Sequence, residues 1–368
     1  MRQELLPEQV LRLRMQSQRL HPRIDAAVGV AGLVRHLGGI QAQDPSAATL
    51  AIRAHSRGLV ADDVRRARED ERSIVLTWAM RGTMHLVATE DVGWLLALLG
   101  PLFIAKNARR YRELGLDGEV RAEATATIHE ALAARSPQTR PELAATLSAR
   151  GIPVEGQAIA HLVRHAALEG VICFGPRRGA TPTYVLLRDW VRPGPALETE
   201  HALAELALRY LGAFGPATVE DLASWSGLPM AQARAAMQII ADRLDEVEMA
   251  GAPAWILPQR DAPPAERAVR LLPSYDTYLL GYRRRDLAVA APHASRVHPG
   301  GGQIKPTLVV DGRAVGVWRS IRRRGTVTIA VEPFEPLDAD ILPALEDETR
   351  DVGRFLGVGA ELYVEPPG

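Results

Sequence analysis

The sequence predicts an α+β chain in which a unit of three helices and a hairpin is repeated before a β-rich end. The pattern is clearest at 120–190, where three helices, the first with Ala124, Ile128 and Leu132 on one face, precede two apolar strands. The same order recurs at 199–258, and the second and third helices are separated by RGIP in one copy and SGLP in the other. Helix, helix–turn–helix and a two-stranded hairpin are the elements of a winged helix.

The repeats divide the chain into four expected regions. A looser copy of the pattern, with a hairpin formed by SIVLTWA and TMHLVA, occupies the first 90 residues. From 268 onward, short β-branched and aromatic runs such as LLPSYDTYLLGY and TVTIAVEPF predict strands, closed by a helix near 338–356 and a strand in AELYVE. We expect three tandem winged helix-turn-helix units followed by a β-rich C-terminal region that contains a long hairpin. The four regions are expected at 1–119, 120–195, 196–267 and 268–368.

Composition excludes several classes of function. The chain has 368 residues, and 44 basic residues balance 44 acidic ones, so no gross polycation or acidic tail is present. Cys173 is the single cysteine, which excludes internal disulfides and cysteine-based zinc clusters. His161 and His165 have helical spacing, but no HExxH motif accompanies them, so a packed helix is the favoured interpretation over a metal site. We expect neither a metal nor a cofactor.

Localisation follows from the apolar segments. The N-terminus is amphipathic and lacks the apolar core of a secretory signal. The longest apolar run, near 94–105, contains Gly100-Pro101 and is too short to span a bilayer. These features predict a cytoplasmic protein.

Basic clusters lie at expected turns and helix ends. Arg322, Arg323 and Arg324 are expected at the tip of a hairpin, where arginine can enter a DNA groove. Each cluster alone also fits a solvated surface run, but several together favour a shared basic face. The other clusters are 106–112, Arg177 with Arg178, and Arg283, Arg284 and Arg285.

A short polar loop separates two of the N-terminal helices. Gly38-Gly39 is expected to end one helix, and Asp44 to cap the next, whose first turn holds Pro45. Gln41 and Gln43 alternate along the link between them, so both amides can point the same way. By composition alone, this is a loop with two polar residues.

The chain resembles the AlkZ-type tandem winged-helix DNA glycosylases along nearly its whole length. The matching stretches are GGIQAQDPSAA at 38–48, TWAMRGTMHLV at 77–87, LLPSYDTYLLGYRRR at 271–285 and KPTLVVDGRAVGVW at 305–318. The resemblance implies removal of N7-alkylated purines, unhooking of interstrand crosslinks, and a catalytic Gln-x-Gln pair formed by Gln41 and Gln43. Wider-specificity relatives tend to carry Gln-x-Asp, so Gln43 indicates the branch that often accompanies biosynthesis of an alkylating natural product such as azinomycin.

The expected chemistry needs no general acid. An N7-alkylated guanine is a cation and leaves as a neutral molecule, so two amides that steer water and stabilise an oxocarbenium-like sugar suffice. Gln43 is expected to position the water and Gln41 to hold it or the deoxyribose. A crosslinked base is tethered to the opposite strand, so it cannot enter a deep flipping pocket. The three winged-helix units are therefore expected to form an open concave surface for double-stranded DNA, with a DNA-binding hairpin in the C-terminal region.

The same resemblance guides the expected DNA contacts. The hairpin of Arg322 to Arg324 is expected to anchor the duplex through its minor groove. His85 is expected to pack inside a strand rather than to face the site. We expect a nucleoid-associated monomer. The further candidates for DNA contact are Arg283, Arg284, Arg285, His298, Lys305, Arg177 and Arg178.

Two alternatives remain open at this point. A non-catalytic winged-helix transcriptional regulator would bind a defined operator and release no base. A protein-interaction scaffold would show no salt-dependent affinity for DNA.

Overall fold

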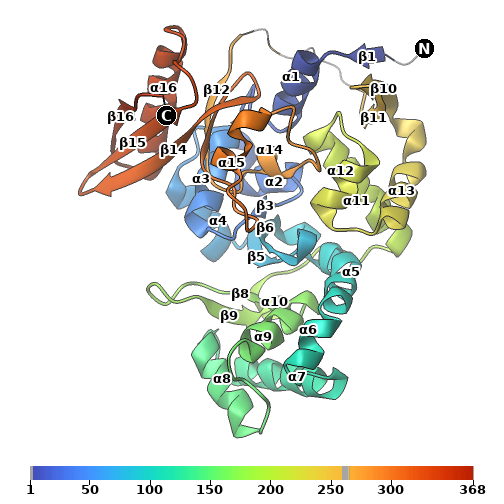
Figure 1. Cartoon of the computed structure of the whole chain (residues 1–368). Helices are drawn as coiled ribbons and strands as arrows, with labels where there is room; N and C mark the ends of the chain where they lie inside the picture. Colours follow the sequence, from blue (N-terminus) through green and yellow to red (C-terminus); the bar gives the residue numbers. More distant parts are fainter. Residues whose placement is uncertain (1–2, 259–263, 265, 368) are drawn as a thin grey trace. The chain divides into compact units, whose positions relative to one another are not determined.

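The computed structural model describes residues 3–258, 264 and 266–367, and the chain divides into two compact units (Figure 1). Unit 1 comprises Met1–Arg65 and Leu203–Gly368, and unit 2 comprises Arg66–Ala202. The last residues of the region expected at 196–267 lie partly outside the described residues. The mixture of helices and sheets confirms the α+β class, whereas the boundaries of the four expected regions stay predictions.

Unit 1 begins with short strands and helices that place the Gln-x-Gln loop. In this segment α2 ends just before the loop and α3 begins just after it. The elements are β1 (Gln3–Leu5), α1 (Pro7–Ser17), β2 (Ile24–Asp25), α2 (Gly29–His36), β3 (Ile40–Gln41), α3 (Pro45–His55), β4 (Ser56–Arg57) and α4 (Ala61–Glu69), the last of which continues past Arg65.

Unit 1 contains the winged-helix order of three helices and two strands that the sequence predicts at 199–258. This order consists of α11 (Thr199–Phe214), α12 (Val219–Ser226), α13 (Met230–Ile239), β10 (Asp245–Met249) and β11 (Ala252–Ile256). Thr218 caps α12 as expected, because its Oγ1 accepts from the Asp221 amide at 3.1 Å while the Asp221 carboxylate accepts from the Thr218 amide. The N-terminal β1 adds to the wing, pairing in parallel with β10.

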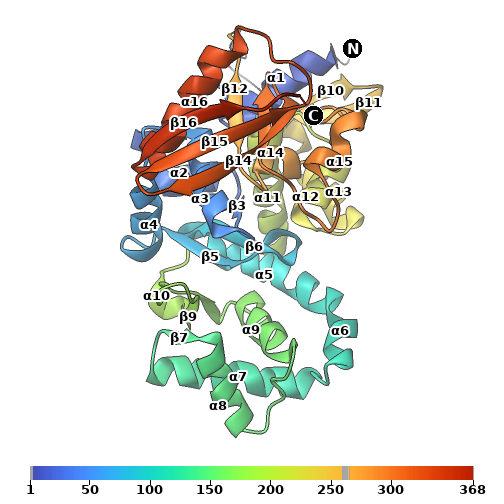
Figure 2. The same cartoon turned by 60° about the vertical axis from the view of Figure 1, so that its left-hand side comes forward.

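The C-terminal part of unit 1 is a five-stranded sheet in the order β12-β13-β14-β15-β16, with β15 and β16 parallel and the other pairs antiparallel. The helix α16 packs against β16, β15 and β12 (Figure 2). A buried core joins this sheet to α1 and α3, with Met15, Ala54 and Val309 among its members. The elements are β12 (Val269–Leu272), α14 (Thr277–Leu280), α15 (Ala294–Val297), β13 (Thr307–Val310), β14 (Arg313–Arg323), β15 (Thr326–Pro333), α16 (Ile341–Leu356) and β16 (Gly359–Val364).

One strand prediction is only partly correct. The run LLPSYDTYLLGY forms β12 only through Leu272, and Thr277–Leu280 is the short helix α14. The Asp276 carboxylate starts this turn by accepting from the Tyr278 amide at 3.0 Å. Because Tyr278 and Leu279 are both buried, the segment is apolar without being a strand.

Unit 2 contains the second winged-helix pattern. The helix α7 packs against α8 and α9, and the wing forms a sheet in the order β7-β9-β8. The elements are β5 (Ile74–Trp78), β6 (Met84–Ala88), α5 (Thr89–Lys106), α6 (Ala108–Glu113), α7 (Gly118–Ala134), β7 (Gln138–Thr139), α8 (Arg140–Ala149), α9 (Ala158–Leu168), β8 (Ile172–Phe174), β9 (Thr183–Leu186) and α10 (Leu187–Trp190).

A close helix contact in unit 2 depends on a glycine. A Cβ at Gly100 of α5 would lie 2.1 Å from the carbonyl oxygen of Leu168, so a side chain there would push α5 away from the end of α9. The apolar run that contains Gly100 is therefore a packed helix. Among the described residues, no helix is long and apolar enough to cross a membrane.

Candidate active site

A sharp turn leads from α2 into the Gln-x-Gln loop. Gly38 and Gly39 have φ values of +66° and +117°, which side-chain-bearing residues rarely adopt. A Cβ at Gly38 would also lie 3.1 Å from the ring of Trp225, so the ring requires glycine at this position. The turn ends α2 as expected and starts β3, which carries Gln41.

Asp44 fixes the far end of the loop. Its Oδ1 accepts hydrogen bonds from the amides of Ser46 at 2.8 Å and Ala47 at 3.2 Å, which caps α3. Pro45 occupies the first helical position, where its missing N–H costs no hydrogen bond. The expected cap and the expected start of the helix are both confirmed.

The two glutamines differ in exposure. Gln41 is 7 % exposed at the end of β3, whereas Gln43 is exposed in the bend that precedes Asp44. The sequence allowed both amides to point the same way, but the chain leaves Gln43 more accessible to a large substrate than Gln41. The surface at the start of α3 therefore presents a neutral amide next to a carboxylate.

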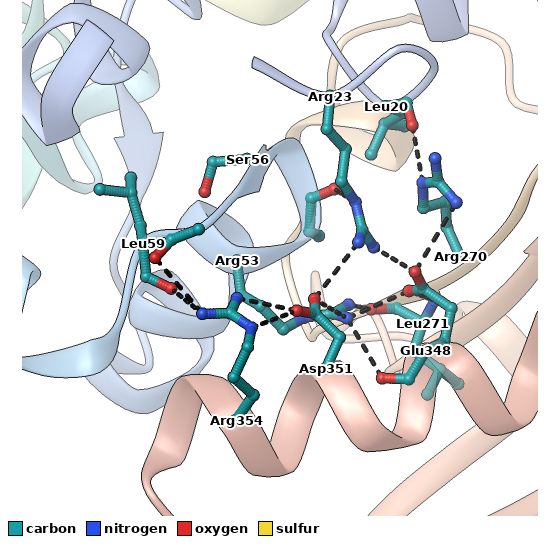
Figure 3. Close-up of polar contacts among 12 residues, drawn as sticks. Leu20, Arg23, Arg53, Ser56, Leu59, Arg270, Leu271, Glu348, Asp351 and Arg354 are labelled. Atoms are coloured by element: carbon teal, nitrogen blue, oxygen red, sulfur yellow. Dashed lines mark hydrogen bonds and ion pairs between the residues drawn. The ribbon is translucent and has the colours of Figure 1, made fainter. Parts of the chain in front are cut away.

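The other end of α3 is held by a buried ionic cluster (Figure 3). Arg53, 1 % exposed, donates from Nη1 to Glu348 at 3.1 Å and to Asp351 at 3.3 Å, both on α16, and from Nη2 to the carbonyl of Leu271 at 2.7 Å. Arg23 pairs with the same two carboxylates. The C-terminal helix thereby fixes the helix that begins at the Gln-x-Gln loop.

Burial and the neighbouring charges shift the pKa values of two groups in this cluster. Burial alone would raise the pKa of Glu348, but Arg53, Arg23, Arg270 and a hydrogen bond from the Leu271 amide lower it to about 2. Burial lowers the pKa of Arg23 to about 10, although Glu348 opposes that change. Both groups stay charged at neutral pH, so the contact is a set of true ion pairs.

A second buried contact holds the last residue of α3. His55 is fully buried, with Nδ1 at 2.6 Å from the carbonyl oxygen of Gln18 and Nε2 at 3.2 Å from both carboxylate oxygens of Asp276. The sequence did not predict this pair. Asp276 lies within the run SYDTY, and no local pattern there connects it to a histidine 221 residues away.

The arginine hairpin lies where the sequence places it. Arg322 and Arg323 end β14, and the turn at Arg324-Gly325 leads into β15. All three arginines are exposed, and among the described residues none has a hydrogen-bond or ion-pair partner for its side chain. Three unneutralised guanidinium groups at one hairpin tip are complementary to a phosphate backbone.

Replacing Arg322, Arg323 and Arg324 together with alanine is expected to weaken duplex binding at least about tenfold near 0.1 M salt. The slope of log affinity against log salt should fall by about 0.9 for each lost phosphate contact. Fluorescence anisotropy over a salt series measures both quantities. Arg350→Ala, which removes an exposed arginine that already pairs with Asp347, is the control and should change neither. An unchanged slope in the triple variant would argue against the hairpin as a DNA contact.

The other arginines expected to contact DNA are partly engaged within the protein. Arg284 pairs with Asp286 at 3.1 Å, and Arg285 donates to the carbonyl of Leu279 at 2.7 Å. Arg178, at the turn of the wing of unit 2, donates to Glu142 at 3.0 Å, and Arg177 donates to the carbonyl of Ala180 in the same turn. The exposed Arg283 uses its backbone amide to bind Asp221. Contact of these residues with DNA stays a prediction.

Two further candidates differ in accessibility. Lys305 is exposed, and among the described residues its ammonium group has no partner. Both ring nitrogens of His298 are buried without a partner in the described part of the chain, and burial together with Arg285 lowers its pKa to about 4. At neutral pH, His298 is therefore uncharged, with its polar atoms turned away from solvent.

Three of the other histidines pack against neighbouring groups of the protein. His85 is 2 % exposed in β6, as expected of a packed strand residue, and its Nδ1 lies 2.9 Å from the carbonyl oxygen of Thr83. Burial lowers its pKa to about 3. His161 and His165 both pack edge-on against Tyr111, with ring centroids 5.9 and 5.7 Å away. Within residues 3–258, 264 and 266–367, no group of three or more metal-binding side chains is present.

Comparison with known proteins assigns this arrangement to a family. The model of the family "DNA glycosylase AlkZ-like" matches residues 34–355. A relative from Streptomyces sahachiroi, named "Interstrand DNA cross-link repair glycosylase", is 33 % identical over 95 % of this chain and 96 % of its own length.

A solved structure, the Streptomyces sahachiroi DNA glycosylase AlkZ, superposes with a TM-score of 0.84 at 28 % identity and covers 98 % of this chain and 100 % of its own. That structure is a tandem winged-helix fold, which confirms the fold expected from the repeats. The chain is thus an enzyme that acts on DNA, a hydrolase of N-glycosyl bonds. It belongs to the AlkZ-like DNA glycosylase family.

Proposed function

We propose that the chain is a monofunctional glycosylase that releases N7-alkylguanine from double-stranded DNA. The observation that carries the proposal is the exposure of Gln43 just before the start of α3. Alkylation at N7 gives guanine a positive charge. When the C1′–N9 bond breaks, its electron pair moves to N9 and neutralises that charge, so the base needs no proton to leave.

The two glutamines have separate roles in this scheme. Gln43 is accessible and positions the attacking water through its carboxamide oxygen, a neutral hydrogen-bond acceptor. Gln41, which is 7 % exposed at the end of β3, holds that water or the deoxyribose. A neutral amide stabilises an oxocarbenium ion only through its dipole, so the site depends on a substrate whose glycosidic bond is already weak.

Interstrand crosslinks are the second proposed substrate. A crosslinked guanine stays tethered to the opposite strand, so the site has to meet it without drawing it into a deep pocket. The surface position of Gln43 and Asp44 fits this requirement, and the similar Streptomyces sahachiroi protein is named for crosslink repair. We further propose that the chain acts as a nucleoid-associated monomer and protects its host against a DNA-alkylating natural product.

Release of base from N7-methylguanine DNA tests the proposed function. A duplex with one such lesion is incubated with the protein, and abasic sites are then revealed by alkaline cleavage. The expected result is cleavage at the lesion and none at unmodified guanine. Tight binding to a defined operator without any release of base would support a transcriptional regulator and contradict the proposal.

A further inference from the structure

Only one of the two carboxylate oxygens of Asp44, the residue after Gln43, accepts hydrogen bonds from the helix that it caps. Asp44 binds the amides of Ser46 and Ala47 through Oδ1 alone. Among the described residues, Oδ2 has no hydrogen-bond partner, and the side chain is exposed. The two hydrogen bonds of the cap restrain the carboxylate of Asp44, which directly follows Gln43 in the chain.

The proposed hydrolysis has a requirement that two amides do not meet. The oxygen of water bonds to C1′, the C1′–N9 electron pair leaves with the base, and the water must give up one proton. A carboxamide accepts a hydrogen bond from this water but is far too weak a base to take its proton. The growing positive charge on the sugar also calls for a full negative charge, which Gln41 and Gln43 lack.

We propose that Asp44 is a catalytic residue, and this inference rests on the proposed glycosylase function. Its Oδ2 takes the proton from the water that Gln43 positions, and its negative charge stabilises the oxocarbenium-like sugar. The hydrogen bonds of the cap orient the carboxylate while weakening its charge in part. In this proposal, Asp44 both caps α3 and acts as the general base.

The substitution Asp44→Asn separates the two roles. Asparagine caps helices about as well as aspartate, so the fold should be preserved while the charge and the basic oxygen are lost. In single-turnover release of N7-methylguanine, the rate should fall at least tenfold with an unchanged melting temperature. Duplex affinity should stay equal or increase, because a negative charge near the phosphates has been removed.

A matched control is available in unit 2. Asp117 caps α7 by accepting from the Val120 amide at 2.9 Å, so Asp117→Asn makes the same change at the start of a helix that does not follow a Gln-x-Gln loop. It should leave the rate unchanged. Asp44→Ser, a second uncharged capping residue, should be slowed as Asp44→Asn is.

The outcomes separate this inference from the proposed function. If Asp44→Asn or Asp44→Ser releases base at the wild-type rate while Gln43→Ala does not, Asp44 is a cap alone and the inference is overturned. A loss of rate that merely follows a fall in melting temperature would overturn it as well. If the unchanged protein releases no N7-methylguanine, it is the proposed function that fails.

Discussion

Replacing Gln43 with alanine is expected to lower the single-turnover rate of N7-methylguanine release by at least about a hundredfold, as removal of one positioned polar group does in other enzymes. The carboxamide that we propose to hold the water is lost, while the cap at Asp44 and the packing of α3 stay in place. Duplex affinity should change less than about threefold, because a neutral amide contributes little to binding a polyanion. Rapid-quench kinetics and anisotropy measure the two effects.

Gln3→Ala is the control for this variant, since it removes an exposed amide from β1. It should alter neither rate nor affinity. A Gln43→Ala protein that released base at the wild-type rate would remove Gln43 from the mechanism. A loss of affinity as large as the loss of rate would assign it to binding instead.

Replacing Glu348 with alanine is expected to lower the free energy of unfolding of unit 1 by about 3–5 kcal/mol, the usual cost of leaving buried charges without their partner. Arg53 and Arg23 would then keep Asp351 as their carboxylate in the cluster, whereas Arg270 would lose its ion pair with Glu348. Urea unfolding followed by circular dichroism measures this change. Because Arg53 lies in the last turn of α3, the same variant should also loosen the helix that carries the glutamine loop.

Asp347→Ala is the matched control for Glu348→Ala. Asp347 lies one residue earlier on α16, is 70 % exposed and pairs with the exposed Arg350. Surface ion pairs of this kind contribute little to stability, so the free energy of unfolding should change by no more than about 0.5 kcal/mol. Equal effects of the two variants would contradict the importance of the buried cluster.

The cluster also predicts a direction for acid stability. Folding lowers the pKa of Glu348 from 4.5 to about 2, so its contribution to stability is present above pH 4.5. That contribution is lost as the pH falls from 4.5 toward 2. The stability difference between the wild type and Glu348→Ala should therefore narrow across this interval.

Local signals in the sequence predicted much of the fold. The glycines at 38 and 39, the cap at Asp44 and the capping box at Thr218 act within a few residues, and each forms as expected. The arginine hairpin likewise follows from two β-branched runs and a turn. Such features need no knowledge of what packs against them.

Long-range contacts escaped the sequence analysis. Arg53 and Glu348 are 295 residues apart, and nothing near either residue marks it as buried and paired. The helix α14 was mistaken for a strand because its apolar residues are buried by distant parts of unit 1. The different exposure of Gln41 and Gln43 likewise depends on tertiary packing, which residue alternation alone does not describe.

Charge on the departing base is the most direct test of the mechanism. Alkaline treatment opens the imidazolium ring of N7-methylguanine and gives a formamidopyrimidine that is neutral, similar in size and in the same duplex position. Single-turnover release should be readily measurable for the cationic base and at least about a thousandfold slower for the ring-opened one, a difference of about 4 kcal/mol in the barrier. Comparable rates for the two bases would show that the enzyme activates the leaving group itself, contrary to a site in which Gln41 and Gln43 only direct water.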